Sequence, residues 1–323
     1  MLELVKYGSV ARPSCSKRMT DVAEIASLIP GERDHLSVLK AADKNSITYY
    51  VGETPEHVSH LRDCTLLCKP GFAPDLEGVD LIPCDNPQLS FYRLSHSFKI
   101  NYLDYSAMVA RDGARIHPDA VIPDSCVIGP GCVIGNCTLG ENVIIEANCV
   151  IYSKTEILED AHIESNTVIG ATGVMWVWDG KDRVFLEQLG GVKIGKGCFI
   201  GSNVSIVRGS ANEVTTIGSN TCMAHGTKIG HGSQIGEFNH FANNVSIGGS
   251  VVSGRGCFFG SGSTVPPGKI LGDEVIVGAG AVITKNIPES GVYSGVPALR
   301  MGDIKEGMSG IPAWNQKSLK APP

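Results

Sequence analysis

The stretch from Thr227 to Ser250 reads TKIGHGSQIGEFNHFANNVSIGGS, and an apolar residue returns in it at every sixth position. The same step extends beyond both ends, and eleven of the twelve positions that it reaches are apolar: Ile217, Met223, Ile229, Ile235, Phe241, Ile247, Ser253, Phe259, Val265, Leu271, Val277 and Ile283. An α-helix has 3.6 residues per turn, so it would not keep these residues on one side. A period of six fits one short strand and one turn per repeat.

Three earlier runs keep the same step: Ile116 to Ile134, Leu139 to Ile169, and Ile194 to Ile206. This repeat predicts a mainly β protein, a parallel β-helix of hexapeptide repeats over residues 106–290, in which each coil is stabilised by its neighbours. In this fold three hexads form one triangular coil that winds left-handed, an exception to the right-handed crossover rule. Residues eighteen apart should therefore lie one above the other.

Small residues occupy the position two before each apolar key residue. Six of the eleven cysteines lie there: Cys126, Cys132, Cys137, Cys149, Cys198 and Cys257. A buried free cysteine behaves as a small hydrophobe, so we interpret these cysteines as packing residues. Cys64 and Cys68 have a spacing that zinc ligands can use, but no second pair follows, and we predict no metal there.

Charge and hydropathy exclude some classes of partner. The chain has 323 residues and a net charge of -6, which opposes bulk attraction to nucleic acid or to an anionic membrane. No apolar stretch reaches the roughly 18 residues of a membrane span, and MLELVKYGSV has no basic patch followed by a long apolar run, as a signal peptide would. We expect a cytoplasmic protein with no membrane span, whose cysteines stay reduced.

Residues 1–105 lack the six-residue period and predict a small α/β domain ahead of the solenoid. TDVAEIASLIP predicts a short helix capped by Thr20 or Asp21, and NPQLSFYRLSHSF predicts a second helix that begins at Asn-Pro. SITYYVG, TLLCKP and VDLIPC are typical of strands. At the other end, NIPESGVYSGVPA should leave the coil, and residues 291–323 should form a loose tail.

Two interruptions, residues 171–191 and 207–216, break the repeat. Loops that leave a rigid scaffold often carry function, so both are candidates for a binding site. Trp176 and Trp178 lie in the first loop. Exposed tryptophans usually contact a partner, so this pair marks the first loop as a candidate binding surface.

Several motifs occur in the order found in one family: NSITYY and CDNPQLSFYRL in the small domain, then ARIHPDAVIP, EQLGGVKIG, VRGSANE and KIGHGSQIG. Over residues 20 to 300 the chain resembles the UDP-3-O-acylglucosamine N-acyltransferases of the hexapeptide acyltransferase superfamily. This resemblance implies a homotrimer with active sites between neighbouring solenoids, and a small domain, residues 1–105, that binds a nucleotide or sugar. It also implies transfer of a hydroxyacyl group from acyl carrier protein to a sugar amine in lipid A synthesis. Trp176 and Trp178 could then wall a channel for the acyl chain or pantetheine arm, or pack on a neighbouring subunit.

The chain also departs from the family. Val207 and Ser210 replace Asp and Ala of Asp-Arg-Gly-Ala, and Ala224-His225 replaces Asp-Asn. Tyr49 matches the family's uracil-binding Phe, but the Tyr position falls near Pro55. The family's helical C-terminal extension has no counterpart, and SGVPA is similar to the ending of acetyl-CoA-dependent sugar acetyltransferases. We therefore predict an N-acyltransferase for a different nucleotide-linked amino sugar, using acyl-CoA or acyl carrier protein and no tightly bound cofactor; the lipid A enzyme itself is the alternative.

The predicted chemistry depends on His231 and Gly249. Amide formation needs a general base for the amine proton, and histidine titrates in the right range. The family's catalytic histidine aligns with His231 and its oxyanion glycine with Gly249, which lies eighteen residues later, one coil above. The Gly249 N–H is therefore the candidate oxyanion donor. Glu213, in the second loop, is a candidate to orient the imidazole.

Four further residues are candidates for substrate contact. His225 and Asn243 are eighteen apart and could contact substrate or form a polar ladder at a corner. Gln188, in the family's Gln-Leu-Gly-Gly motif, could contact the sugar or the backbone. Tyr49 could stack on a nucleobase or serve as a core residue of a strand.

Two rival functions use the same scaffold. A zinc enzyme of the γ-carbonic anhydrase kind would need three converging histidines, and His225, His231 and His240 are the available set. A spacing of six places the first two on adjacent sides of the coil, which opposes convergence. The other rival is a solenoid without catalytic activity that serves only in assembly.

Overall fold

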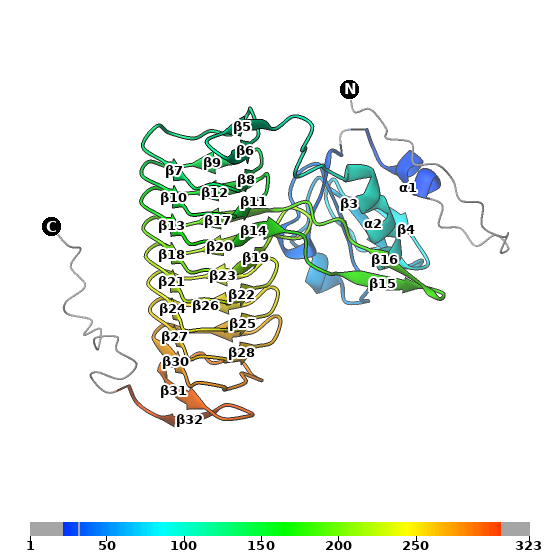
Figure 1. Cartoon of the computed structure of the whole chain (residues 1–323). Helices are drawn as coiled ribbons and strands as arrows, with labels where there is room; N and C mark the ends of the chain where they lie inside the picture. The colour runs from blue at the N-terminus through cyan, green and yellow to red at the C-terminus, as the bar shows by residue number, and fades with distance from the viewer. Residues whose placement is uncertain (1–21, 32, 305–323) are drawn as a thin grey trace.

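The structure is a computed structural model that describes residues 22–31 and 33–304. A tall triangular solenoid forms one part, and a small α/β domain lies beside its N-terminal half (Figure 1). The fold is a left-handed parallel β-helix of hexapeptide repeats preceded by a small α/β domain, as the sequence predicts.

The small domain contains a parallel sheet with the strand order β1-β2-β3-β4. Its strands are β1 (His35–Leu36), β2 (Ser46–Tyr49), β3 (Thr65–Cys68) and β4 (Asp80–Pro83). Its helices are α1 (Val22–Leu28) and α2 (Pro87–Ser95), with 3₁₀ turns η1 (Leu39–Ala41), η2 (Pro55–Val58) and η3 (His96–Phe98). Both predicted helices and all three predicted strands are confirmed, whereas the proposed caps Thr20 and Asp21 lie outside the described residues.

Three parallel sheets form the faces of the solenoid. The ten-stranded face contains β7 (Val127–Ile128), β10 (Ile144–Ile145), β13 (His162–Ile163), β18 (Phe199–Ile200), β21 (Cys222–Met223), β24 (His240–Phe241), β27 (Phe258–Phe259), β30 (Val275–Val277), β31 (Gly291–Ser294) and β32 (Leu299–Gly302). The nine-stranded face contains β5 (Val109–Arg111), β6 (Ala114–Ile116), β8 (Val133–Ile134), β11 (Val150–Ile151), β14 (Val168–Ala171), β19 (Ser205–Val207), β22 (Lys228–Ile229), β25 (Ser246–Ile247) and β28 (Thr264–Val265). The seven-stranded face contains β9 (Thr138–Leu139), β12 (Thr155–Ile157), β17 (Gly191–Ile194), β20 (Val214–Ile217), β23 (Gln234–Ile235), β26 (Val252–Ser253) and β29 (Ile270–Leu271).

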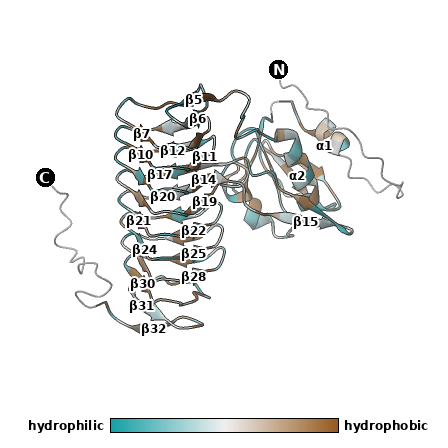
Figure 2. Ribbon diagram, in the orientation of Figure 1, coloured by the Kyte–Doolittle hydropathy of each residue, from teal (hydrophilic) through white to brown (hydrophobic). Residues whose placement is uncertain are grey.

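The apolar residues that recur at every sixth position stack above one another and form the hydrophobic core of the solenoid. Ile229 pairs with Ile247 and Ile247 with Val265, so partners are eighteen residues apart in these uninterrupted coils. The second residue of each short strand points inward and the first points outward, which gives the alternation of hydrophobic and hydrophilic residues along each coil (Figure 2). Ser253, the polar exception among the key residues, is buried and bonds to Asn239 Nδ2 at 3.1 Å.

Tight corners connect the strands, and asparagine is common at them. Asn166, Asn203 and Asn244 have positive φ angles of 57–63°. Asparagine tolerates this left-handed backbone region better than most residues with a side chain. The small slot before each key residue is also confirmed: Cys132 and Cys149 are buried, and the Cys132 thiol donates to the Glu146 carbonyl at 2.8 Å.

All of the main interruptions occur at one corner of the triangle, where the chain turns from the nine-stranded to the seven-stranded face. The first loop connects β14 to β17, and the second connects β19 to β20. We call this corner the loop edge and define it by residues 152–154, 172–190, 208–213, 230–233 and 248–251. His231 and Gly249 lie on it because they follow β22 and β25.

The C-terminal prediction is partly wrong. Residues 291–302 do not leave the sheet, because β31 pairs in parallel with β30 and β32 returns antiparallel to β31. The two strands cover the last coil and extend the ten-stranded face. Residues 305–323, the rest of the predicted tail, lie outside the described residues. In the described part of the chain, no helix has the length and apolar character needed to cross a bilayer.

Candidate functional site

His231 and Gly249 lie in contact on the loop edge, as predicted for residues that are eighteen apart in stacked coils. A methyl group on Gly249 would lie 2.7 Å from the Cδ2 and Cε1 atoms of His231, inside van der Waals contact. The coil that contains Gly249 is hydrogen-bonded directly to the coil that contains His231, because Ser250 N–H donates to the His231 carbonyl at 2.7 Å. Only a residue without a side chain therefore fits above the imidazole in this arrangement.

The environment of His231 favours the neutral imidazole. Burial lowers the pKa of His231, the negative charge of Glu213 opposes this effect, and the positive charge of Lys40 adds to it. Its Nδ1 atom is buried and has no hydrogen-bond partner among the described residues. A neutral imidazole at neutral pH is the form that can accept a proton.

Gly249 presents an unused backbone donor. Within residues 22–31 and 33–304, no hydrogen bond is formed by its N–H, as at the matching corner residues Ser219 and Glu237. The free N–H is thus a property of the repeat. What distinguishes Gly249 is the imidazole directly below it, which brings a proton acceptor and a free donor together.

Glu213 lies beside His231 without a hydrogen bond to it. Its carboxylate packs against Gly232, where an added methyl group would lie 2.7 Å from Oε2. Ser210 Oγ donates to Oε2 at 2.5 Å, and Lys40 Nζ forms an ion pair with Oε1 at 3.1 Å. The carboxylate therefore acts on the imidazole through its charge, whereas the prediction assigned it an orienting role.

The two loops of the loop edge are joined backbone to backbone. Gly190 N–H donates to the Gly209 carbonyl at 3.1 Å, and Gly209 N–H donates to the Gly191 carbonyl at 3.0 Å. A methyl group on Gly190 would lie 2.7 Å from the Gly209 carbonyl oxygen, so a side chain does not fit. This contact gives a structural reason for the glycines in QLGG and VRG.

A fully buried arginine holds the base of both loops. Arg208 donates to the carbonyls of Gly170, Gly190 and Ser153 at 2.7, 3.3 and 3.2 Å. Its guanidinium lies 3.3 Å from the centroid of the Tyr102 ring, in the segment that leads from the small domain to the solenoid. Arg208 thus joins both loops to the interdomain segment.

Replacement of Arg208 by methionine should lower the free energy of unfolding by about 3 kcal/mol, because three carbonyls lose a donor in a buried place. Arg255→Met is the matched control, since Arg255 is exposed and its guanidinium lies 4.8 Å from the centroid of the Phe238 ring. Urea unfolding followed by circular dichroism measures both variants. Equal midpoints for the two variants would contradict the role given to Arg208.

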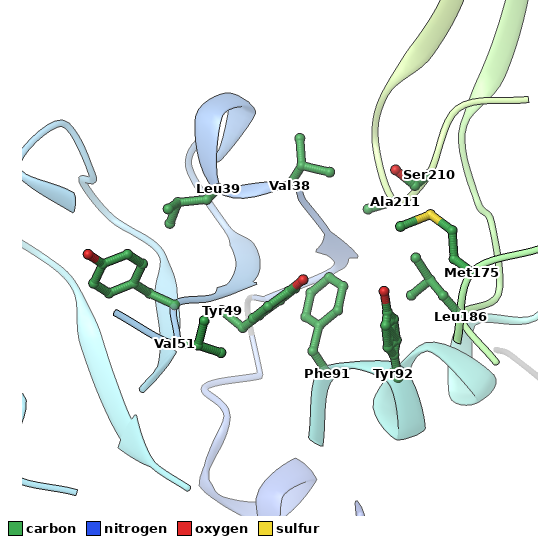
Figure 3. A pocket seen from close by; sticks show the side chains of 11 residues that line it. Val38, Leu39, Tyr49, Val51, Phe91, Tyr92, Met175, Leu186, Ser210 and Ala211 are labelled. Carbon is green, nitrogen blue, oxygen red and sulfur yellow. The ribbon is translucent and has the colours of Figure 1, made fainter. Parts of the chain in front are cut away.

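A cavity of about 260 Å³ lies between the small domain and the two loops (Figure 3). Aromatic side chains from β2 and α2 line one side, and the Tyr49 and Phe91 ring centroids are 4.9 Å apart. Met175, Leu186, Ser210 and Ala211 of the loops line the other side. Burial raises the pKa of Tyr49 to about 12, so its phenol stays neutral.

Ser210 connects this cavity to His231. Its side chain lines the cavity, and its hydroxyl is bonded to the carboxylate that lies beside the imidazole. A ligand that lies against the aromatic rings and extends along the loop edge past Ser210 would point toward His231. The site has an apolar compartment and a polar compartment with a proton acceptor.

Comparisons with known proteins match the hexapeptide repeat and the fold. The family described as "Bacterial transferase hexapeptide (six repeats)" matches residues 136–171, and "Hexapeptide repeat of succinyl-transferase" matches 191–209 and 250–285. The chain is 34% identical to a UDP-3-O-acylglucosamine N-acyltransferase of Delftia acidovorans over 65% of this chain and 63% of that protein. A relative of the same name from Coxiella burnetii is 29% identical over 67% of this chain and 68% of that protein.

The chain is similar to proteins of the hexapeptide-repeat acyltransferase superfamily. It spans 63% of the length of the Delftia relative and 38% of a Janthinobacterium relative, under two thirds in both cases. Among solved structures, the UDP-N-acetylglucosamine O-acyltransferase of Moraxella catarrhalis is 28% identical, with a TM-score of 0.55 over 61% of this chain and 76% of that one. The Francisella novicida acyltransferase is 26% identical, with a TM-score of 0.52 over 58% and 66%.

In this hexapeptide-repeat solenoid, His225 and Asn243 lie at a different corner from His231. They follow β21 and β24, so they belong to the corner between the ten-stranded and nine-stranded faces. His225 is exposed, and its Nδ1 accepts from Ser202 N–H at 3.1 Å and lies 3.3 Å from Glu164. Within one protomer these residues are separated from the His231 site, and contact with substrate across protomers stays a prediction.

The two tryptophans do not line the cavity. They lie on β15 (Trp176–Asp179), which forms a hairpin with β16 (Asp182–Phe185), and their ring centroids are 4.8 Å apart. The side chains of this hairpin alternate, so the tryptophans face outward while Met175, Val177 and Val184 pack on the small domain. A role toward the acyl donor or a neighbouring subunit stays a prediction.

Gln188 is buried inside the first loop. Its Oε1 accepts a hydrogen bond from Gly173 N–H, and its carbonyl accepts from the Tyr102 hydroxyl at 3.0 Å. The side-chain Nε2 has no partner among the described residues. Of the two predicted roles, the contact with backbone is the one present, and the sugar contact would require this side chain to become exposed.

Sequence reasoning missed Phe91, Tyr92 and Lys40 as site residues. Phe91 and Tyr92 read as the apolar face of a helix, and Lys40 is one surface lysine in a 3₁₀ turn. No local signal distinguishes them, because the loops that complete the cavity come from residues 175–211. As for metals, the described residues contain no group of three or more His, Cys, Asp or Glu that could hold an ion.

Proposed function

We propose that this protein transfers an acyl group from an acyl thioester to the amine of a nucleotide-linked amino sugar. One observation supports it most: a half-buried imidazole lies against a glycine with a free N–H, beside an aromatic cavity at the interdomain junction. The relatives named above carry out N-acylation of a UDP-linked acylglucosamine according to their names.

In the proposed reaction, the sugar amine attacks the thioester carbonyl carbon and forms a C–N bond. The carbonyl electrons move onto oxygen, and the Gly249 N–H donates to this oxyanion. His231 accepts the proton that nitrogen loses. Collapse of the intermediate breaks the C–S bond, and the imidazolium returns the proton to the departing thiolate. The products are an amide and a free thiol, and no oxidant or metal enters the balance.

The cavity is the proposed site of the nucleotide base. Tyr49 and Phe91 provide ring faces on which a base can stack, and the enclosing aliphatic side chains exclude water. The sugar would then extend past Ser210 toward His231. The acyl donor is acyl-CoA or acyl carrier protein, it enters from the open side of the loop edge, and we propose no tightly bound cofactor. The cytoplasmic location stays a prediction from the sequence.

A donor and acceptor screen tests this function. Purified protein is mixed with acyl-CoA or acylated carrier protein and with UDP-linked or dTDP-linked amino sugars, and free thiol and amide product are measured. Thiol release that depends on the amino sugar supports the proposal. Preference for UDP-3-O-acylglucosamine would identify the lipid A reaction, the second candidate that the relatives favour. Absence of thiol release with every pair would support a solenoid without catalytic activity.

We also propose a homotrimer assembled through the ten-stranded face. Outward positions there are apolar or aromatic over most of its height: Val127, Ile144, His162, Phe199, Cys222, His240 and Phe258. Phe199 is 37% exposed and Val127 is 57% exposed. A continuous apolar stripe of this kind is typical of an interface. No comparable stripe runs along the seven-stranded face, where Glu156, Lys193 and Gln234 point outward.

Replacement of Phe199 by glutamate should break the trimer, because three buried carboxylates would be introduced near each other. Val252→Glu on the seven-stranded face is the matched control. Light scattering after gel filtration should give the mass of three 34.2 kDa chains for the wild type and for the control, and of one chain for the Phe199 variant. A wild-type monomer, or a trimer in all three proteins, would contradict this interface.

A further inference from the structure

Lys40 reaches from the small domain to the carboxylate beside His231. It lies in η1, and its Nζ is 3.1 Å from Glu213 Oε1. The Lys40 side chain is 66% exposed, but that of Glu213 is only 8% exposed. Exposed ion pairs contribute little, whereas a carboxylate shielded from water depends on the groups that face it.

A second contact fixes the same junction. Asn212 Oδ1 accepts from Val38 N–H at 3.2 Å, and Asn212 Nδ2 donates to the Ala41 carbonyl at 3.0 Å. The segment 38–41 is therefore clamped onto the second loop on both sides of Lys40. Because Val38 and Leu39 also line the cavity, one short segment contacts both the predicted nucleotide pocket and the loop that holds Glu213.

We propose that Lys40 is a positioning residue of the acyltransferase site: its ion pair with Glu213 sets the net charge beside His231 and links the base to the small domain. This inference rests on the proposed role of His231 as the base. Lys40 contacts no reacting atom in this account; paired with Glu213, its positive charge offsets the carboxylate charge that favours the imidazolium. Its effect should therefore appear in the pH at which the imidazole titrates.

The charged groups acting on the His231 imidazole come from two elements. Glu213 comes from the loop between β19 and β20, and Lys40 comes from η1. The same coil places Gly232 next to the imidazole, and the coil above places Gly249 there; neither residue has a titratable side chain. Positive charge disfavours the imidazolium, so removal of Lys40 raises the pKa of His231, whereas removal of the Glu213 charge lowers it.

NMR titration of ¹³C/¹⁵N-histidine-labelled protein tests this without any need for turnover. The His231 signal is assigned by its loss in His231→Asn. In Lys40→Met its titration midpoint should rise by roughly 0.5–1 pH unit, and in Glu213→Gln it should fall, as expected for single charges near a partly shielded group. In Lys40→Met/Glu213→Gln the Lys40 effect should shrink, because without the carboxylate the exposed lysine is no longer held near the imidazole.

Two control variants separate this role from a general loss of surface charge. Lys44→Met removes a lysine from the same segment and should leave the midpoint unchanged, while Lys40→Arg keeps the charge and should restore it. If the enzyme turns over, the rising limb of kcat/KM against pH should move with the midpoint in Lys40→Met. KM for the nucleotide sugar should change less than kcat at pH 6.

The outcomes distinguish this inference from the proposed function. Turnover combined with an unmoved His231 midpoint in Lys40→Met overturns the inference and leaves the acyltransferase proposal standing. A moved midpoint in a protein that shows no turnover with any donor supports the Lys40 linkage and counts against the proposed function. Equal shifts in Lys40→Met and Lys44→Met would also overturn the inference.

Discussion

Replacement of His231 by asparagine should lower kcat/KM by about 10²–10⁴-fold, which is the range expected for loss of a general base. The side chain remains polar and is smaller than imidazole, so it fits below Gly249 without collision. It cannot accept a proton from the amine at neutral pH. The loss should therefore fall on kcat more than on KM for the nucleotide sugar, because the aromatic cavity is unchanged.

The measurement is steady-state thiol release with the best donor and acceptor pair. His117→Asn, far along the solenoid from the site, is the control and should keep wild-type rates. Light scattering should show the same oligomer in all three proteins, which separates lost chemistry from lost assembly. If His231→Asn keeps more than about a tenth of wild-type kcat/KM, the imidazole is not the base, and groups of the substrate itself must handle the proton.

Replacement of Gly249 by alanine should lower kcat by about 10²–10³-fold, similar to loss of an oxyanion donor. Its φ angle lies in the ordinary range, so alanine introduces no backbone strain there. The new methyl group would instead collide with the His231 ring and occupy the space that the tetrahedral carbon needs. The imidazole can rotate away, so the free energy of unfolding should change by less than about 1 kcal/mol.

Gly31→Ala is the matched control for this variant. Gly31 also has an ordinary φ, and a methyl group there would meet no atom within 4 Å. Thermal unfolding and thiol release together distinguish the two mechanisms of loss. An active Gly249→Ala enzyme would show that the acyl group does not approach this glycine, and the oxyanion assignment would fail. A variant that unfolds at much lower temperature would indicate a structural role instead.

The fold could be read from the sequence because a β-helix is nearly one-dimensional. Each hexad contacts only its neighbours, so the period at Ile229, Ile235 and Phe241 fixes the strand, the corner and the inward side chain together. The contact of His231 with Gly249 follows from the same registry. The interrupted coils were less predictable, since Val168 pairs with Ser205 and the number of residues between stacked strands changes there.

The cavity could not be predicted from local patterns. It is formed by segments around residues 38–51, 91–92, 175–186 and 210–211, and only the folded chain brings them together. Trp176 and Trp178 gave the stronger sequence signal, yet their neighbours Met175 and Leu186 line the cavity. Successive side chains of the hairpin point to opposite faces, so either the tryptophans or their neighbours face the small domain. Which set faces it depends on the side of the hairpin that packs on α2. The C-terminal strands β31 and β32 were missed because they do not follow the six-residue period.

The chain differs from the UDP-3-O-acylglucosamine N-acyltransferase family that it resembles at residues that surround the site. Ser210 stands where the family pattern has alanine, and here its hydroxyl is bonded to Glu213 and faces the cavity. Phe91 and Tyr92 of α2 line the cavity with Tyr49, while the family's second aromatic position falls near Pro55. These differences are consistent with an acceptor other than the family's own, and the donor and acceptor screen decides between them.

A crystal structure of the protein with a bound UDP-linked amino sugar tests the central claim most directly. The account predicts the nucleotide base stacked against the Tyr49 and Phe91 rings, the sugar along Ser210, and the amine within about 3 Å of His231 Nε2, the distance at which a base can take its proton. A nucleotide bound away from this cavity, or an amine that His231 cannot reach directly or through one water, would contradict it.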